Sequence, residues 1–361
     1  MKKRIFALGL SAVTVMALAG CGGGSSSETA ELAADGKYEG EELNVFLWPE
    51  YIPDDVIEDF ENLYGVTVNV STFSSNEEML SKFQNSADGT YDILNPSDYM
   101  VEYMAGEGLL AELDKSALTN YENLSEQYLG QDFDKDNTYS VPFAPGVFAV
   151  GYDKTVYPDG ISSLSDLFDE KYAGSVFVPD DTKILIGMVN KSLGFSLNES
   201  DESNLEKTKE KLMSFKENVY ALKFEGTQDL LISGECPLGY TFNGSIAMAQ
   251  AENSDIEVYF PTEEGTYRWI DNLCIPANSE KQELATEFIN YILDAEVDCK
   301  IRTEVCSTSP NEAGWALVDE SISGLDSLNI PEECWDNSEY AANLDDATNK
   351  IYNDMYAEFT K

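Results

Sequence analysis

Apolar and polar positions near the start of the folded body follow strand and helix periods in turn. An apolar run of strand length occupies 43–47, and Val56, Ile57 and Phe60 then recur along one helix face. Pro53 precedes this helix and two acidic residues open it, as is typical of a helix start. Strands alternating with helices favour a parallel sheet with helical crossovers. The expected elements are strands at 43–47, 66–70 and 91–94 and helices at 54–63 and 76–83.

A proline-containing segment at 139–151 divides the rest of the chain. It reads YSVPFAPGVFAVG, so we expect an extended crossing into a second lobe. The body beyond the tether has about 320 residues, a size at which single cores usually split. After the crossing the pattern predicts strands at 175–178, 238–241, 256–260 and 267–275, the last two returning to the first lobe, and helices at 203–219, 282–293 and 346–359.

The first residues have the layout of a bacterial export signal. Basic residues at 2–4 precede an apolar run at 5–17 that is too short to span a bilayer comfortably. The sequence LAGC then resembles a lipobox, in which Cys21 is lipidated; an ordinary cleaved signal that contains a cysteine is the alternative. We expect a lipoprotein signal peptide at 1–20, a flexible Gly/Ser-rich tether at 21–39 and an extracytoplasmic protein anchored to the cell membrane.

The charge balance excludes one class of partner. The chain carries 22 Lys and Arg against 67 Asp and Glu, a net charge of −45. A nucleic-acid-binding surface needs the opposite sign, so we expect no nucleic-acid partner. The acidity serves either solubility or the attraction of cations.

Histidine is absent from the sequence, which removes the commonest general base and the commonest zinc ligand. Five cysteines remain if Cys21 carries lipid, and their spacings match no metal motif. Asp132, Asp134 and Asp136 alternate as in a calcium loop, but the Gly and Glu that such a loop requires are missing. We therefore expect no enzymatic activity, no metal and no cofactor.

Aromatic and acidic residues gather in segments that follow predicted strands or open predicted helices. The carboxyl ends of parallel strands form one edge of a sheet, where ligands usually bind. Trp269 and Asp271 lie two apart on a strand and therefore face the same side. The candidate ligand-binding residues are Trp48, Glu50, Tyr51, Ser97, Tyr99, Asp181, Phe242, Trp269 and Asp271.

This mixture suits a ligand with methylene segments and ammonium groups. Aromatic faces cover the methylenes and attract the cations, while a buried ammonium needs a carboxylate in reach. A sugar would need a more mixed set of donors and acceptors. Each residue also has a structural alternative when taken alone. Asp181 suits a helix cap, the aromatics suit a core, and Glu50 and Asp98 suit solvated loops.

Five segments of the chain keep the order and spacing of one known family. They read FLWPEYIP at 46–53, STFSSNEEM at 71–79, YDILNPSDYMV at 91–101, YSVPF at 139–143 and YRWIDNLCIPAN at 267–278. On these segments the chain resembles the periplasmic spermidine/putrescine-binding proteins of ABC transporters. The resemblance covers 43–311 and is weaker toward the C-terminus.

The resemblance implies an α/β fold of the two-lobed, type II periplasmic-binding-protein kind. Each lobe has a mostly parallel sheet flanked by helices, and a polyamine lies in the cleft between the lobes. The implied partners are that polyamine, an ABC permease and, through Cys21, the membrane; we expect a monomer. The expected lobes are 40–143 plus 267–316 and 144–266 plus 317–361, with hinges near 143–147 and 261–266.

The resemblance also implies roles for the candidate residues. Asp181 and Asp271 pair with amines, Glu50 lies near an amine, and the aromatics enclose the chain of the ligand. Two departures bear on the ligand: Pro49 stands where the family often has Thr, and Ile184 stands where spermidine binders have a second acidic residue. Phe242 replaces a family Trp. The missing carboxylate weakens the expectation of spermidine relative to putrescine, and the sequence does not rank the two.

Three other functions stay open at this point. The cleft could hold a sugar, an amino-acid derivative or another organic cation. A lipid-anchored hydrolase would need two carboxylates flanking a scissile bond, roughly 5–10 Å apart. A purely sensory or adhesive surface protein is the third alternative.

Overall fold

The computed structural model describes residues 36–342 and 344–361. The predicted signal peptide, the lipidation site at Cys21 and most of the predicted tether lie outside the described residues. Among the described helices, none has the length and apolar character needed to cross a membrane.

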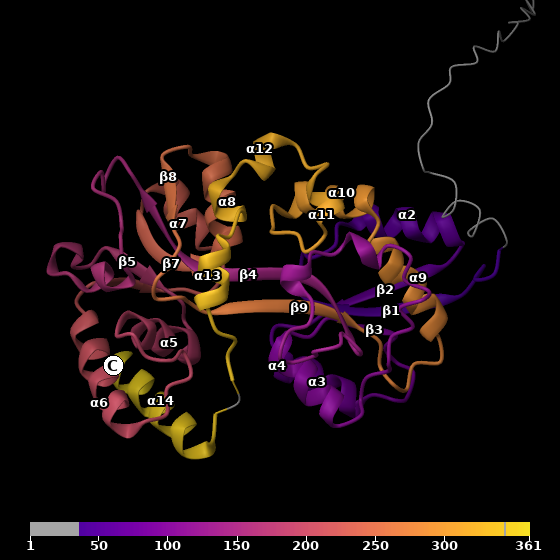
Figure 1. The fold of residues 1–361 in the computed structure, drawn as a ribbon, viewed down its shortest axis with the longest axis horizontal. Coiled ribbons are helices and arrows are strands. Elements are labelled where there is room, and N and C mark those ends of the chain that lie inside the picture. Colours follow the sequence, from indigo (N-terminus) through magenta and orange to yellow (C-terminus); the bar gives the residue numbers. More distant parts are fainter. Residues whose placement is uncertain (1–35, 343) are drawn as a thin grey trace, which may run out of the picture.

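The described strands form one continuous sheet that runs through two lobes (Figure 1). In the first lobe, β1 lies between β2 and β3 and pairs with both in parallel, as predicted. Gly65 ends the first helix with a φ of 67°, a left-handed conformation that glycine adopts without strain. The elements are β1 (Glu42–Leu47), α2 (Asp54–Tyr64), β2 (Thr67–Thr72), α3 (Asn76–Asn85), β3 (Ile93–Leu94), α4 (Asp98–Gly106), η1 (Tyr121–Asn123) and η2 (Glu126–Tyr128).

Two long strands cross between the lobes. The first half of β4 (Ser140–Asp153) pairs antiparallel with β9 (Arg268–Cys274), and its second half pairs with β7 (Leu238–Phe242). Figure 1 shows β4 and β9 side by side between the two lobes. The register shifts between Pro142 and Ala144, at the start of the predicted hinge 143–147. The lobe boundaries and the hinges themselves stay predictions.

The second lobe is an α/β layer built on the far half of β4. Its sheet order is β4-β7-β5-β6, with β5 parallel to β6 and β7. Two predictions here are wrong. The helix expected at 203–219 ends at Phe215, so that Val219 begins a strand, and β8 pairs with residues 150–153 instead of returning to the first lobe. The elements are η3 (Leu164–Phe168), η4 (Glu170–Tyr172), β5 (Val176–Val178), α5 (Thr182–Ser192), α6 (Glu202–Phe215), β6 (Val219–Leu222), α7 (Gln228–Ser233), α8 (Asn243–Glu252) and β8 (Ile256–Tyr259).

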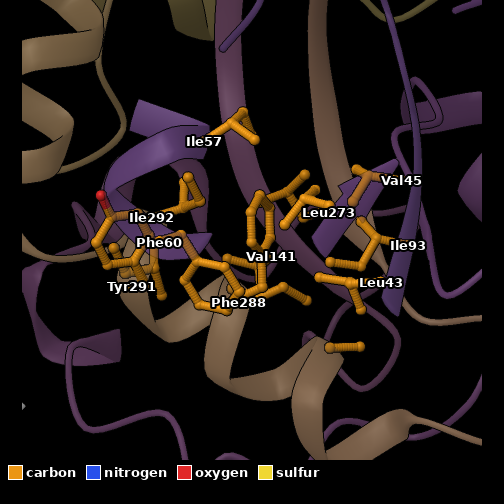
Figure 2. Close-up of a cluster of buried hydrophobic side chains, with 14 of the residues drawn as sticks. Leu43, Val45, Ile57, Phe60, Ile93, Val141, Leu273, Phe288, Tyr291 and Ile292 are labelled. Atoms are coloured by element: carbon orange, nitrogen blue, oxygen red, sulfur yellow. The ribbon is translucent and has the colours of Figure 1, made fainter. Parts of the chain in front are cut away.

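The core of the first lobe packs α2 and α9 (Gln282–Ile292) onto the sheet. Figure 2 shows this cluster, in which Phe60 meets Phe288 edge-on at 4.9 Å between ring centroids. Next to it, α10 (Ala295–Val305) carries a buried ion pair, with Arg302 Nε 2.9 Å from Asp298 Oδ1. Arg302 Nη2 also donates to the Phe143 carbonyl at 2.7 Å, which ties this helix to the crossing strand.

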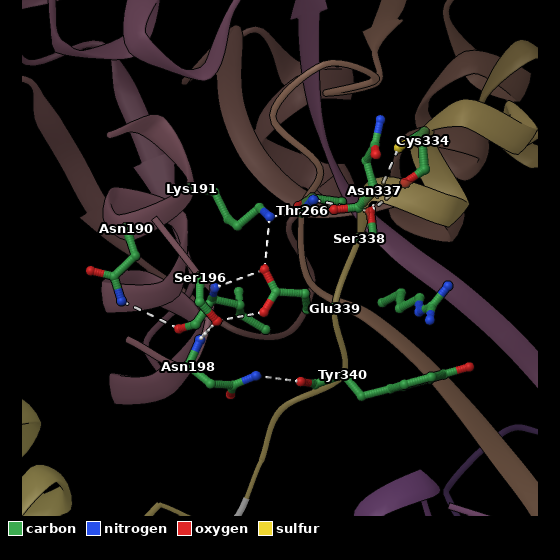
Figure 3. Close-up of polar contacts among 12 residues, drawn as sticks. Asn190, Lys191, Ser196, Asn198, Thr266, Cys334, Asn337, Ser338, Glu339 and Tyr340 are labelled. Atoms are coloured by element: carbon green, nitrogen blue, oxygen red, sulfur yellow. Dashed lines mark hydrogen bonds and ion pairs between the residues drawn. The ribbon is translucent and has the colours of Figure 1, made fainter. Parts of the chain in front are cut away.

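The C-terminal part of the chain returns past the crossing strands to the second lobe. The Glu339 amide donates to Thr266 O at 3.0 Å, and its carboxylate lies 2.8 Å from Lys191 Nζ and accepts from Ser196 Oγ at 2.6 Å (Figure 3). The final helix then packs against α5 and α6. The elements are α11 (Glu312–Trp315), α12 (Glu320–Ser323), η5 (Asp326–Leu328), α13 (Glu332–Asn337) and α14 (Asp346–Phe359).

Candidate functional site

A cavity of about 620 Å³ lies between the two lobes. Its walls come from the loop after β1, the starts of α3, α4 and α5, the strand β9 and the helix α14. Eight of the nine predicted residues line it: Trp48, Tyr51, Ser97, Tyr99, Asp181, Phe242, Trp269 and Asp271. The ninth, Glu50, lines an adjacent cavity of about 520 Å³ that shares several aromatic walls with the first.

The Asp271 carboxylate is the most enclosed charged group in this cavity, with 3% of the residue exposed. The Ser97 hydroxyl donates to Oδ1 at 2.5 Å, and the Tyr51 hydroxyl donates to Oδ2 at 2.6 Å. Asn76 Nδ2 in turn donates to Ser97 Oγ at 2.9 Å, while Asn76 Oδ1 accepts from the Ser97 amide at 3.0 Å. This chain of hydrogen bonds fixes the orientation of the carboxylate.

Burial raises the pKa of Asp271 to about 6, although the hydrogen bonds from Ser97 and Tyr51 oppose the rise. Within residues 36–342 and 344–361, no Lys or Arg lies within ion-pair distance of this carboxylate. The nearby guanidinium of Arg302 is paired with Asp298. A buried carboxylate without a counter-ion is costly, and a cation in the cavity would offset that cost.

Aromatic rings form the walls around this carboxylate. Phe242 and Trp269 meet at 90° with their ring centroids 5.3 Å apart, and Phe224 stands edge-on to Phe242 at 5.2 Å. The indole of Trp269 lies directly over Gly146, where an added Cβ would be 2.1 Å from the ring atom Cζ2. The Trp48 ring packs against Phe73, with the two ring centroids 4.5 Å apart. These faces suit methylene groups and cations.

The second-lobe end of the cavity carries further charges. Asp181 caps α5, because its Oδ1 accepts from the Ile184 amide at 2.9 Å, while Oδ2 has no hydrogen-bond donor among the described residues. Both interpretations of Asp181 therefore hold: it is a helix cap and it lines the cavity. Across the cavity the Tyr99 hydroxyl donates to Glu77 Oε1 at 3.2 Å. The Lys183 ammonium lies 5.6 Å from the centre of the Tyr99 ring.

Of the two acidic residues whose loop positions suggest solvation, Asp98 and Glu50, only Asp98 differs from that expectation. Asp98 is buried instead of solvated: its Oδ2 accepts from the Ile270 amide at 3.0 Å and its Oδ1 from the Tyr99 amide at 2.8 Å. Burial raises its pKa to about 7. Through the hydrogen bond from the Ile270 amide, Asp98 positions β9 beside the cavity. Glu50, in contrast, is exposed, and its backbone has a φ of 60°.

Sequence reasoning missed several residues that line the cavity. Glu77 falls inside the segment 71–79 that carried the family resemblance, and Tyr267 begins the segment 267–278, so both could have been found there. The residues on α14 had no such signal, because the resemblance weakens toward the C-terminus. The missed lining residues are Ser74, Ser75, Asn76, Glu77, Asp180, Thr182, Lys183, Ile184, Phe224, Tyr267, Ala341, Asn349, Tyr352 and Asn353.

The described part of the chain holds no group of His, Cys, Asp or Glu residues arranged to bind a metal ion. Cys236, Cys274, Cys299, Cys306 and Cys334 are all free thiols.

Comparisons with known proteins agree with this architecture. The sequence profile of bacterial extracellular solute-binding proteins matches residues 55–310. A spermidine/putrescine-binding periplasmic protein of Salmonella typhimurium is 33% identical over 87% of this chain and 90% of its own length. A putrescine/cadaverine-binding protein of Pseudomonas aeruginosa is 31% identical over 80% of this chain and 84% of its own.

Among solved structures, a spermidine/putrescine ABC transporter substrate-binding protein from Streptococcus pneumoniae superposes with a TM-score of 0.81. It is 29% identical, and the match covers 89% of this chain and 99% of that one. The predicted fold class is therefore confirmed.

Proposed function

The chain belongs to the family of bacterial extracellular solute-binding proteins, and we propose that it captures a polyamine, putrescine or spermidine, and delivers it to an ABC permease. Members of this family bind solutes and are not enzymes, which removes the hydrolase alternative. The protein is thus an extracytoplasmic binding component.

The observation that carries the proposal is the buried Asp271 carboxylate. It lies in a cavity between the lobes, it is oriented by Ser97 and Tyr51, and it has no cationic partner among the described residues. An organic ammonium group supplies the missing charge and up to three hydrogen-bond donors. A neutral sugar supplies no charge and would leave the carboxylate uncompensated.

The rest of the cavity fits the remainder of a polyamine. Methylene groups pack between Trp269, Phe242 and Trp48, which exclude water from the apolar part of the ligand. The open Oδ2 of Asp181, in the same cavity, accepts the second ammonium. Glu50 lies outside the main cavity and adds negative potential to the adjacent one.

The relatives support the same ligand class. The matched Salmonella typhimurium protein is named for spermidine and putrescine, and the Pseudomonas aeruginosa protein is named for putrescine and cadaverine. All of these ligands are flexible cations with several amines.

Ligand capture requires a change in the distance between the lobes. We place the hinges at 143–147, next to the register shift of β4, and at 261–266, just before β9. The lobes that move are 40–143 plus 267–316 and 144–266 plus 317–361. The closed form, as a monomer, is the form that docks on the permease.

The N-terminal pattern supports retention at the membrane. We propose that residues 1–20 are removed, that Cys21 is lipidated and that 21–39 tether the body to the outer face of the membrane. Mass spectrometry of the protein purified from membranes tests this directly. A diacylglyceryl mass on an N-terminal Cys21 is expected, and an unmodified N-terminus contradicts it.

Isothermal titration calorimetry with putrescine, spermidine, a sugar and an amino acid tests the function. We expect heat with at least one polyamine and none with the sugar or the amino acid. If a protein that melts cooperatively, and is therefore folded, gives no heat with either polyamine, the proposal is wrong.

A further inference from the structure

Lys183 places a cation of the protein inside the ligand cavity. It is the second residue of α5 and is half-buried, and it lines both the main cavity and a small side cavity next to it. Its ammonium lies 5.6 Å from the centre of the Tyr99 ring, across the space between the lobes. Its position in the first turn of α5 is fixed by the Asp181 cap.

The ammonium of Lys183 has no conventional partner. Among the residues that the structure describes, no carboxylate lies within ion-pair distance of it and no oxygen accepts a hydrogen bond from it. By contrast, Lys191 on the same helix pairs with Glu339 at 2.8 Å, and Lys300 pairs with two aspartates at 2.8 Å each. In a chain of net charge −45, carboxylates for pairing are plentiful. The Tyr99 face therefore acts as the partner of the Lys183 ammonium.

The surroundings show that this position suits a cation. Asp180, Asp181 and Glu77 line the same end of the cavity, so the field there is negative even with one lysine present. Tyr99 offers its ring face, and its hydroxyl is held by Glu77. A ligand ammonium would bind over an aromatic face that lies beside carboxylates, and in this protein the Lys183 ammonium takes that position.

We propose that Lys183 is a specificity-determining residue that makes this site prefer a diamine to a triamine. The inference rests on the proposed polyamine-binding function. Asp271 and Asp181 accept the two ammonium groups of a diamine, and Lys183 occupies the aromatic position that a third ammonium would take. A triamine must displace Lys183 or place a third positive charge beside it, and like charges at such distances repel.

Blocking of one position by Lys183 can be distinguished from the general electrostatic effect of removing a lysine. Removing any lysine from an acidic protein strengthens the binding of every cation slightly, and more so for a trication than a dication. A lysine that blocks one position acts much more strongly on the longer ligand. The quantity to measure is therefore the ratio of the spermidine Kd to the putrescine Kd, compared with a matched lysine elsewhere.

The test measures both Kd values by calorimetry for the wild type, Lys183→Met and Lys183→Glu. Lys207 provides the control, because its ammonium also lies over an aromatic ring, Phe195 at 5.4 Å, but it is exposed and lines none of the cavities described above. Lys207→Met and Lys207→Glu make the same charge changes. Thermal melting of all variants confirms that each one is folded.

We expect the wild type to bind putrescine at least tenfold more tightly than spermidine. Lys183→Met lowers the Kd ratio by at least tenfold, Lys183→Glu lowers it further, and both Lys207 variants change it by less than threefold. An unchanged ratio in the Lys183 variants, an equal change in the Lys207 variants, or a wild type that prefers spermidine overturns the role of Lys183. A wild type that binds no polyamine overturns the proposed function itself.

Discussion

The hydroxyl of Tyr51 donates a 2.6 Å hydrogen bond to Oδ2 of Asp271, although the two residues lie 220 positions apart in the chain. The bond joins the loop after the first strand of the sheet to the strand that crosses between the lobes. Together with Ser97 on the other oxygen, it orients a buried carboxylate before any ligand arrives. Such preorganisation lowers the cost of ordering the site on binding.

Replacing this carboxylate by an amide should weaken binding strongly. In Asp271→Asn the shape is kept and one oxygen still accepts a hydrogen bond, but an NH2 group replaces the second acceptor, and the charge that compensates an ammonium group is lost. We expect the Kd for putrescine to rise at least tenfold, which corresponds to about 1.4 kcal/mol or more. Calorimetry at pH 7 measures the change.

The matched control for that variant is Asp326→Asn, which removes an exposed aspartate in η5 that lines neither ligand cavity. Its Kd should equal that of the wild type. Because burial disfavours the charged form of Asp271, the amide variant should melt no lower than the wild type at pH 7. Wild-type affinity in a folded Asp271→Asn protein would disprove the role of this carboxylate.

The affinity should fall as the pH is lowered from 7 to 5. The pKa of Asp271 is raised to about 6 by burial, so about nine-tenths of this carboxyl is protonated at pH 5. A protonated carboxyl has no charge to offer, whereas ligand ammonium groups with pKa values near those of lysine, about 10.4, stay charged across this window. We expect a putrescine Kd about tenfold higher at pH 5 than at pH 7.

Two variants assign this pH effect to one group. Asp98, whose pKa burial raises to about 7, accepts hydrogen bonds from two backbone amides and does not line the cavity. Asp98→Asn should therefore keep a fall in affinity between pH 6 and pH 5. Asp271→Asn should lose it. A pH profile that follows Asp98 instead would contradict the assignment.

The indole of Trp269 depends on the absence of a side chain at Gly146. A Cβ there would lie 2.1 Å from Cζ2 and 2.5 Å from Cη2 of the ring, so Gly146→Ala must displace the aromatic wall. We expect a Kd for putrescine about tenfold higher, from the loss of roughly 1–2 kcal/mol of cation–π and apolar contact. Gly106→Ala, where nothing lies within 4 Å of the added Cβ, should bind normally.

The ion pair inside the first lobe should matter for stability. Asp298→Ala leaves the Arg302 guanidinium buried without its counter-ion, which typically costs about 3–5 kcal/mol of the free energy of unfolding. Lys300 lies on the same helix as Arg302, and its partner Asp59 on α2 is exposed. Asp59→Ala should therefore cost less than about 1 kcal/mol of the free energy of unfolding. Urea denaturation without ligand measures both, and equal costs would contradict the difference in burial.

Local patterns predicted most of the elements that position the site. The helix with Val56, Ile57 and Phe60 on one face formed as expected, because a periodic apolar stripe and a terminal glycine act within one segment. The strand at Val219–Leu222 was missed, because its first residue continues the apolar spacing of the preceding helix. Where the helix stops is decided by pairing with β5, a contact between distant segments.

The candidate site could be predicted where short segments carry it. Trp48, Ser97 and Asp271 follow or lie on strands whose order in the sheet brings them together. The burial of Asp98 could not be read locally, since it depends on the Ile270 amide 172 positions away. The cation over Tyr99 likewise depends on how α5 of one lobe faces α4 of the other.

The most direct test of the central claim is a crystal structure of the protein grown with putrescine. We expect one ligand ammonium within hydrogen-bond distance of Asp271, methylenes between Trp269 and Trp48, and the second ammonium at Asp181. A ligand bound elsewhere, or a filled cavity in which the Asp271 carboxylate contacts no cation, would contradict the central claim.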